Sequence, residues 1–236
     1  MSNANKMSQA SLGLYIDRRA FCGMALMGGL GLIGLANGRL ADAAESADKQ
    51  GAAAAEAQSE PVKASTFAFN TLVNITAYGV DADVVASCIK DCAMYDDLFS
   101  ARKEGAEIMR INEAGGEPVE VSADTADLIA AGLEYGRQTD GAFDITIGSV
   151  SLLWDFINAV KPTDEEIAEG LKHIDYTQVV LDGTTVTMGD PEARLDLGGI
   201  AKGWIAARLV DKLEQAGCTS GLVDLGTSSV YAIGSK

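Results

Sequence analysis

The sequence predicts an α+β fold, with a mixed, largely antiparallel sheet and packed helices. Several segments alternate apolar and polar residues, as strands do, and others repeat apolar residues at helical spacing between clear capping signals. Asp182-Gly183 also stands between two β-rich runs, which is the sequence signal of a tight β-hairpin with a type I′ turn. Helices mixed with hairpin-linked strands are typical of α+β proteins. The chain has 236 residues, 47% of them apolar, enough for the core of one large domain or two small ones.

The strands are expected in four places besides the hairpin. Residues 67–78 alternate, with Phe67, Phe69, Val73, Ile75 and Ala77 on one face of a single half-buried strand. The other three expected strands are ARLDL (193–197), SGLVDLG (220–226) and SVYAIG (229–234).

The helices are expected at about 81–99, 123–138, 163–174 and 203–216. Ser122 is the predicted N-cap of the second helix, and Thr163 with Glu166 forms a capping box for the third. Gly217 is expected at the C′ position of the last helix. Cys88 and Cys92 lie on the apolar face of the first helix, with Val84, Tyr95 and Phe99, so these cysteines are expected in the core, and so is Cys218.

Charge and composition exclude several classes of function. The chain has 34 acidic and 18 basic residues, a net charge of −16, so it should repel nucleic acid. His173 is the sole histidine, which leaves almost no material for a histidine metal cage or a Ser-His-Asp triad.

The first 64 residues do not resemble a folded domain. Asp17-Arg18-Arg19-Ala20-Phe21 precedes a glycine-rich, moderately apolar stretch, and Ala41-Asp42-Ala43 is a plausible cleavage site, so residues 1–43 resemble a twin-arginine export signal. The alternative is a cytosolic chain with an accidental arginine pair. Residues 44–64, rich in Ala, Glu and Gln, are expected to be a flexible linker. The folded part is then 65–236, and the signal predicts that it is exported across the cytoplasmic membrane, either free or associated with the membrane.

The segment DLGGIAKGW (196–204) carries the first functional signal. Gly198 and Gly199 leave the backbone bare for close approach of a ligand, and Lys202 adds a cation near the start of a helix. Asp196 can accept hydrogen bonds from a ligand hydroxyl or ring N–H. The pattern is neither a Walker loop nor G-x-G-x-x-G, and it fits a phosphate site or a purely structural glycine turn.

A second segment, TDGAFDITIGSVSLLWDF (139–156), reads on its own as a turn and an apolar strand. Together with DLGGIAKGW, about 50 residues later, it resembles the FAD:protein FMN transferase (ApbE) family, with its G-A-F-D-x-T-x-G and D-L-G-G-I-A-K-G-Y/W motifs. FSARKEGAEIMRIN (99–112) and GLVDLG (221–226) fit two further motifs of that family. The resemblance covers roughly residues 66–234.

The resemblance implies an α+β (T-fold-like) enzyme that binds FAD and Mg²⁺. Such enzymes transfer FMN to a threonine or serine hydroxyl of a target flavoprotein and release AMP. Carried over by position, the FAD-binding residues are Ala142, Phe143, Asp144, Asp196 and Lys202, of which Asp144 and Lys202 are the catalytic candidates. Gly199 would lend its backbone carbonyl to the metal.

The chain also departs from the family pattern. The family's other metal ligands, in an A-D-A-x-S-T-type motif, are expected beyond residue 236, so residues 65–236 would be the N-terminal part of the domain, as a fragment or a shortened paralogue. Three functions remain open: an exported flavin transferase, a non-catalytic flavin-binding or carrier protein, and an interaction domain without a ligand.

Overall fold

The computed structural model describes residues 60–156 and 158–234. The predicted export signal and most of the predicted linker lie outside these described residues. The first strand begins at Val62, three residues before the domain boundary expected from the sequence. In the described part of the chain, no helix is long and apolar enough to cross a membrane.

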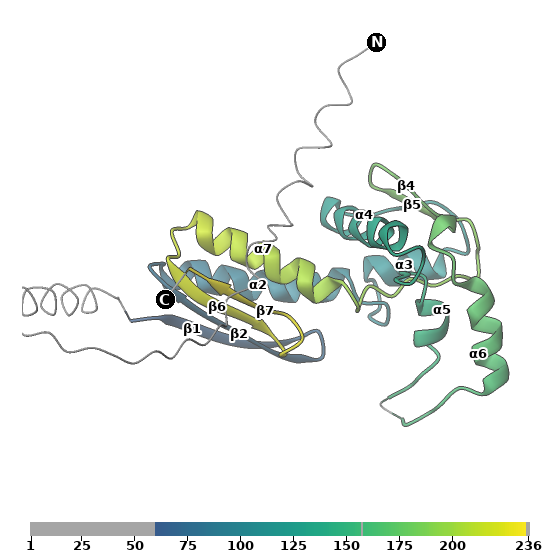
Figure 1. Cartoon of the computed structure of the whole chain (residues 1–236), viewed down its shortest axis with the longest axis horizontal. Helices are drawn as coiled ribbons and strands as arrows, with labels where there is room; N and C mark the ends of the chain where they lie inside the picture. Colours follow the sequence, from purple (N-terminus) through teal and green to yellow (C-terminus); the bar gives the residue numbers. More distant parts are fainter. Residues whose placement is uncertain (1–59, 157, 235–236) are drawn as a thin grey trace, which may run out of the picture. The chain divides into compact units, whose positions relative to one another are not determined.

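A four-stranded antiparallel sheet holds the two ends of the described chain together (Figure 1). Its order is β1-β2-β6-β7, with β1 at Val62–Ala68, β2 at Thr71–Tyr78, β6 at Ser220–Leu225 and β7 at Val230–Ile233. The central pair joins β2 to β6, with Val73 opposite Leu225 and Ile75 opposite Val223. Both strands expected near the end of the sequence are therefore confirmed.

The single strand expected over 67–78 is wrong, because the chain turns back in its middle. Phe69 and Asn70 have φ of 54° and 56°, and they form a two-residue turn between β1 and β2. Two successive residues with positive φ are what a type I′ hairpin turn requires. The turn puts Phe67 on the outer face, where it is 73% exposed, while Val73, Ile75 and Ala77 are buried.

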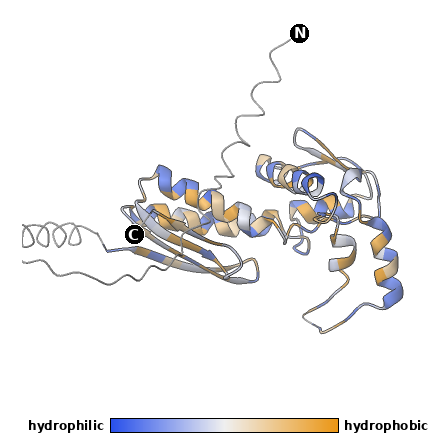
Figure 2. Cartoon of the chain, viewed as in Figure 1, coloured by the Kyte–Doolittle hydropathy of each residue, from blue (hydrophilic) through white to orange (hydrophobic). Residues whose placement is uncertain are grey.

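Two helices cover one face of this sheet, α2 (Ala82–Leu98) and α7 (Ala201–Gln215) (Figure 1). Figure 2 shows apolar residues on these strands and on both helices. Cys88 and Cys92 are fully buried in α2, as expected, and Cys218 is also buried. All three are free thiols. Burial raises the pKa of Cys88 to about 11 and that of Cys92 to about 12.

The rest of the described chain contains a second, three-stranded sheet of order β3-β5-β4. Its strands are β3 (Val119–Glu120), β4 (Val179–Asp182) and β5 (Thr185–Met188). The other α-helices of the described chain are α3 (Glu107–Glu113), α4 (Ala123–Gln138), α5 (Gly148–Ser151) and α6 (Asp164–Gly170). Two 3₁₀ turns, η1 (Leu171–His173) and η2 (Tyr176–Gln178), follow α6.

The predicted caps are confirmed in detail. The Ser122 side chain accepts a hydrogen bond from the backbone N–H of Thr125 at the start of α4. Thr163 and Glu166 make both bonds of the capping box at α6. Gly217 follows the end of α7 with φ of 94°. The side-chain oxygens satisfy N–H groups that the first helical turn cannot pair.

Three local expectations are corrected. The β4–β5 hairpin turns at Gly183 and Thr184, and only Gly183 has a positive φ, which fits a type II′ turn better than the expected type I′. ARLDL is not a strand, because it makes only an isolated bridge from Arg194 to Ile147. The second motif forms turns and the short helix α5, where an apolar strand was expected.

Candidate functional site

The two motifs meet, although about 50 residues separate them in sequence. The backbone N–H of Asp196 donates to the carbonyl of Ile145 at 2.9 Å, and Ile147 pairs with Arg194 in a parallel bridge. The hydroxyl of Ser151 donates to Asp196 Oδ2 at 2.6 Å. The segment around Asp144 and the segment around Asp196 therefore form one unit.

Gly148 allows this close contact. A Cβ at this position would lie 2.4 Å from the carbonyl oxygen of Arg194, closer than real Cβ atoms come to other atoms. Any side chain here would force the two motif segments apart. The requirement for glycine at position 148 is therefore structural and does not depend on a ligand.

Buried Asn112 holds the backbone that leads into DLGGIAKGW. Its side-chain amide donates to the carbonyl of Leu195 at 2.9 Å, and its side-chain oxygen accepts from the N–H of Leu195 at 2.6 Å. The paired contact mimics a strand neighbour and satisfies both buried backbone groups. Sequence reasoning placed Asn112 only at the end of a motif match and gave it no role.

Phe143 lies against the glycine turn. A Cβ on Gly199 would be 3.3 Å from Phe143 Cε2, while Gly198 and Gly199 remain exposed. The Phe143 ring also meets Tyr135 of α4 edge to face, with 6.1 Å between the ring centroids. Bare backbone and an aromatic side chain thus come together from the two motifs that the family resemblance assigns to one site.

The loop before Phe143 is tied to the end of α4. The N–H of Phe143 donates to Thr139 Oγ1 at 2.9 Å, and the N–H of Ala142 donates to the Thr139 carbonyl at 3.0 Å. Ala142 itself is exposed. These contacts fix the backbone of the loop and leave the Ala142 side chain open to solvent.

Asp144 uses both carboxylate oxygens within the protein. Oδ1 accepts from the N–H of Thr146 at 2.7 Å and from the Thr146 hydroxyl at 2.6 Å. Oδ2 accepts from the N–H of Tyr176 at 2.9 Å. The three donors give Asp144 a structural function in this structure: it holds its own loop and joins it to η2.

Asp196 lies at the edge of the glycine turn. Its Oδ1 accepts from the N–H of Gly198 at 2.8 Å, and its Oδ2 accepts from Ser151. The carboxylate thereby fixes the backbone of the turn. Each oxygen retains a lone pair that a ligand N–H or O–H could use.

Lys202 lies in the first turn of α7, which begins two residues earlier than expected from the sequence. The side chain is half-buried, and among the described residues it makes no hydrogen bond or ion pair. In particular it is bonded neither to Asp144 nor to Asp196. An unpaired cation at the positive end of a 15-residue helix favours binding of an anion.

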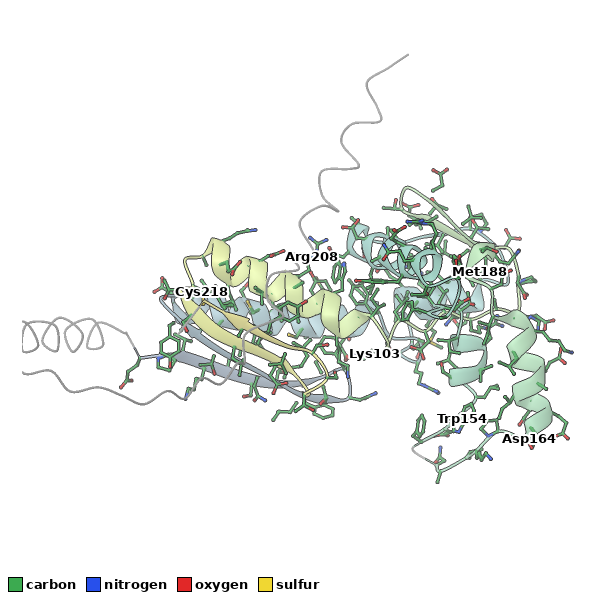
Figure 3. All side chains as sticks on the ribbon, in the orientation of Figure 1. Lys103, Trp154, Asp164, Met188, Arg208 and Cys218 are labelled. Carbon is green, nitrogen blue, oxygen red and sulfur yellow. The ribbon has the colours of Figure 1, made fainter. Side chains whose placement is uncertain are left out.

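An aromatic cluster supports the start of α7. Trp204 meets Tyr95 and Phe99 of the α2 segment edge to face, at 5.5 and 5.6 Å between centroids. The guanidinium of Arg208, labelled in Figure 3, lies 4.6 Å from the Trp204 ring centroid. The cluster anchors the helix turn that carries Lys202.

The described residues do not supply a complete metal site around Gly199. Nowhere in ranges 60–156 and 158–234 do three or more His, Cys, Asp or Glu side chains gather so that they could hold a metal ion. Gly199 is an exposed residue with one backbone carbonyl to offer, whereas magnesium takes six oxygen ligands. The described part of the chain would therefore supply only part of a magnesium coordination sphere.

Three comparisons place this site among known proteins. The sequence profile of the ApbE family matches residues 69–236. The FAD:protein FMN transferase of Klebsiella pneumoniae (strain 342) is 33% identical over 162 residues, 66% of this chain and 51% of that protein. The corresponding protein of Haemophilus influenzae is 31% identical over 138 residues, 54% of this chain and 40% of that protein.

Solved structures agree. A crystal structure of the ApbE protein of Thermotoga maritima aligns with a TM-score of 0.69 and 31% identity, over 75% of this chain and 60% of that one. The flavin transferase ApbE of Vibrio cholerae aligns with a TM-score of 0.65 and 26% identity, over 71% and 57% of the two chains. The chain spans about half the length of the curated relatives described above. With a family profile matched over most of its length and the same α+β fold, the chain belongs to the ApbE family.

Proposed function

We propose that the chain acts as a flavin transferase, which cleaves FAD and attaches FMN to a threonine or serine hydroxyl of a target flavoprotein. Relatives that are 31% and 33% identical to it are named for this activity. The observation that carries the proposal is the arrangement of Lys202, Gly198-Gly199 and Phe143. It joins an unpaired cation, a helix N-terminus, bare backbone and an aromatic ring.

The chemistry suits this arrangement. In the transfer, the acceptor hydroxyl oxygen bonds to the FMN phosphorus, the bond from that phosphorus to the bridging oxygen breaks, and AMP leaves with that oxygen. The hydroxyl proton is lost to a base or to solvent. Negative charge builds up on the phosphates, so Lys202 and the N–H groups of α7 would stabilise the transition state.

Asp144 and Asp196 would take different parts in the proposed site. Asp196 would contact FAD through its remaining lone pairs while it holds the glycine turn. Asp144 already accepts three hydrogen bonds, so we propose that it chiefly shapes the loop beside FAD. Action of Asp144 as a base would require it to give up one of these contacts.

Magnesium dependence is part of the proposal, with the Gly199 carbonyl as one ligand. When bound, the metal would neutralise charge on the pyrophosphate. The second candidate function is a flavin-binding protein without transfer activity. It is favoured by the engagement of Asp144, the candidate base, in three hydrogen bonds within the protein.

Titration with FAD, followed by flavin fluorescence with and without Mg²⁺, tests the site. Lys202→Ala should weaken binding about ten- to a hundredfold, since a charge-assisted contact to phosphate contributes roughly 1.5–3 kcal/mol. Gly199→Val should weaken it at least as much, by filling the space beside Phe143. Lys90→Ala, at an exposed position on α2, is the matched control and should bind FAD like the wild type.

If both site variants bind FAD like the wild type, DLGGIAKGW is only a structural turn and the proposal loses its main support. Release of AMP in the presence of a flavin-accepting target, measured by chromatography, separates the two candidate functions. A protein that binds FAD but releases no AMP, with Mg²⁺ present, is a flavin-binding protein.

We also propose that the protein is exported through a twin-arginine signal, with cleavage near Ala43. Replacing Arg18 and Arg19 by lysine should leave the uncleaved precursor in the cytoplasm, as seen by fractionation and immunoblotting. Lys6→Arg is the control with an unchanged arginine pair. Normal export of the double variant would contradict the proposal.

A further inference from the structure

The sole histidine of the sequence, His173, lies beside the candidate site. It is not one of the residues proposed to bind FAD. His173 ends η1, and its Nδ1 is 2.7 Å from Oδ2 of Asp190. The imidazole is mostly buried, with 18% of the side chain exposed. The hydrogen bond to His173 is the main cause that lowers the pKa of Asp190 below its ordinary value.

On one side, His173 belongs to the segment that holds the Asp144 loop. Its carbonyl lies 3.3 Å from the hydroxyl of Ser149. Two residues later the N–H of Asp175 donates to Thr146 Oγ1 at 2.9 Å, and the N–H of Tyr176 donates to Asp144 Oδ2. A shift of the His173 backbone would therefore reach Asp144 through Tyr176, three residues further along the chain.

On the other side, Asp190 belongs to the segment that leads to Asp196. Its carbonyl accepts from the N–H of Ala193 at 3.2 Å. The next residue, Arg194, donates its N–H to Ser149 Oγ at 3.0 Å. The His173–Asp190 pair thus connects the segments that support the two motifs.

The second ring nitrogen is in an unusual position. Nε2 of His173 is buried and has no hydrogen-bond partner among the described residues. Glu192 Oε2 lies 3.2 Å away, and Glu169 Oε1 of α6 lies 4.0 Å away. Lys172, the nearby cation on η1, is paired with Glu169 at 2.5 Å.

These contacts give the two protonation states of His173 different effects. Because ionised Asp190 accepts from Nδ1–H, the neutral ring has a bare lone pair on Nε2, which lies 3.2 Å from Glu192 Oε2 without the geometry of a hydrogen bond. Protonation turns Nε2 into a donor, and the Glu192 side chain, which is 72% exposed, can turn to accept from it. The ring is then held by Asp190 on one nitrogen and by Glu192 on the other.

We propose that His173 and Asp190 are positioning residues for the flavin site, and that protonation of His173 tightens the contact between the segment supporting Asp144 and the segment leading to Asp196. The proposal rests on the proposed FAD-binding function. Its result is a pH-dependent affinity for FAD that comes from a side chain outside the binding site.

One NMR experiment tests the coupling without FAD. The full chain has a single imidazole, so its ring signals report His173 alone at every pH. The backbone amide signals of Tyr176 and Thr146 should move with the same midpoint as the His173 ring. In His173→Asn, whose amide keeps a donor near the Nδ1 position, these amide signals should stay constant over the same pH range.

FAD titrations at a series of pH values test the consequence. In the wild type, the dissociation constant for FAD should rise roughly two- to tenfold as His173 loses its second proton, the range expected for residues that act through others. His173→Asn should bind with pH-independent affinity. Glu165→Gln, an exposed charge change on α6, is the control and should keep the wild-type pH profile. Circular dichroism melting confirms that each variant is folded.

The outcomes separate the two proposals. Wild-type FAD binding with the same pH profile in His173→Asn overturns the positioning function and leaves the flavin site intact. If the wild type binds no FAD at any pH, the proposed function fails, and the amide signals alone decide whether His173 controls the Asp144 loop. Amide signals that ignore the His173 titration overturn the inference in either case.

Discussion

The four-stranded sheet with α2 and α7 and the site segments 139–151 and 194–203 are specified in different ways. The sheet region is held by apolar side chains at regular spacing, such as Val73 and Ile75 on β2 and Leu209 on α7. The site segments are held by polar side chains bonded to backbone, chiefly from Asn112, Asp144 and Asp196. The first region tolerates exchange of similar apolar residues, whereas the second depends on individual atoms.

The largest loss of stability is expected in the sheet region. Leu209→Ala removes a side chain that is 1% exposed, and large-to-small changes at such sites cost about 2–5 kcal/mol. Urea unfolding followed by circular dichroism measures the loss. The folded fraction should still bind FAD normally. A lower FAD affinity, after correction for unfolded protein, would contradict the division between the two regions.

Asn112→Ala should lower the free energy of unfolding less than Leu209→Ala does, and it should weaken FAD binding more. It leaves the N–H and carbonyl of Leu195 without partners, at roughly 1–3 kcal/mol per buried group before water or relaxation compensates. We expect a net loss of about 2–3 kcal/mol in urea unfolding and clearly weaker FAD binding. Asn158→Ala, at an exposed asparagine, is the control. Unchanged FAD binding by Asn112→Ala would show that the clamp does not position the site.

The buried cysteines predict a pH dependence confined to the sheet region. A thiol with a raised pKa holds its proton more tightly in the folded chain than in the unfolded chain. The contribution of each thiol to the free energy of unfolding is therefore complete below its unfolded pKa of about 8.5. This contribution is lost as the pH rises toward the folded pKa values, about 11 for Cys88 and about 12 for Cys92. The free energy of unfolding should fall above about pH 9, and less steeply in Cys92→Ala.

Ile89→Val on the same helix removes volume without a titratable group, and serves as the control for the cysteine experiment. It should lower stability by the same amount at pH 7 and pH 10. An unchanged pH slope in Cys92→Ala would mean that other groups cause the alkaline loss.

The smallest effect is expected at the α6 cap. Thr163→Ala removes the side-chain bond to the N–H of Glu166 and should cost about 1 kcal/mol. Thr163→Ser keeps the hydroxyl and should stay close to the wild type. If both variants lose the same amount, the capping box does not stabilise this helix.

The contrast also explains what the sequence could predict. Helices α2, α4 and α7 follow from apolar spacing and from local signals such as Ser122 and Gly217, which act within a few residues. The glycine turn and Phe143 were predicted to lie together only through the resemblance to a known family. No local pattern relates Gly148 to Arg194 or Asn112 to Leu195, because these contacts join segments far apart in sequence.

The two wrong strand predictions, over 67–78 and 193–197, arise because tertiary contacts override the local pattern. The turn at Phe69 and Asn70 was missed because alternation continues through it and neither glycine nor proline marks it. ARLDL was expected to be a strand because its composition suits one, yet its neighbours are side chains and loops. Tertiary contacts decided both cases.

The pairing of β2 with β6 has a consequence for how the chain folds. Val73 lies opposite Leu225, so the central pair of the sheet cannot form until about 150 further residues have been synthesised. Closing such a large loop is slow compared with forming a helix or a local hairpin. The β1–β2 hairpin must wait with one edge unpaired, where it could join another chain. We therefore expect refolding at high protein concentration to compete with aggregation through this edge.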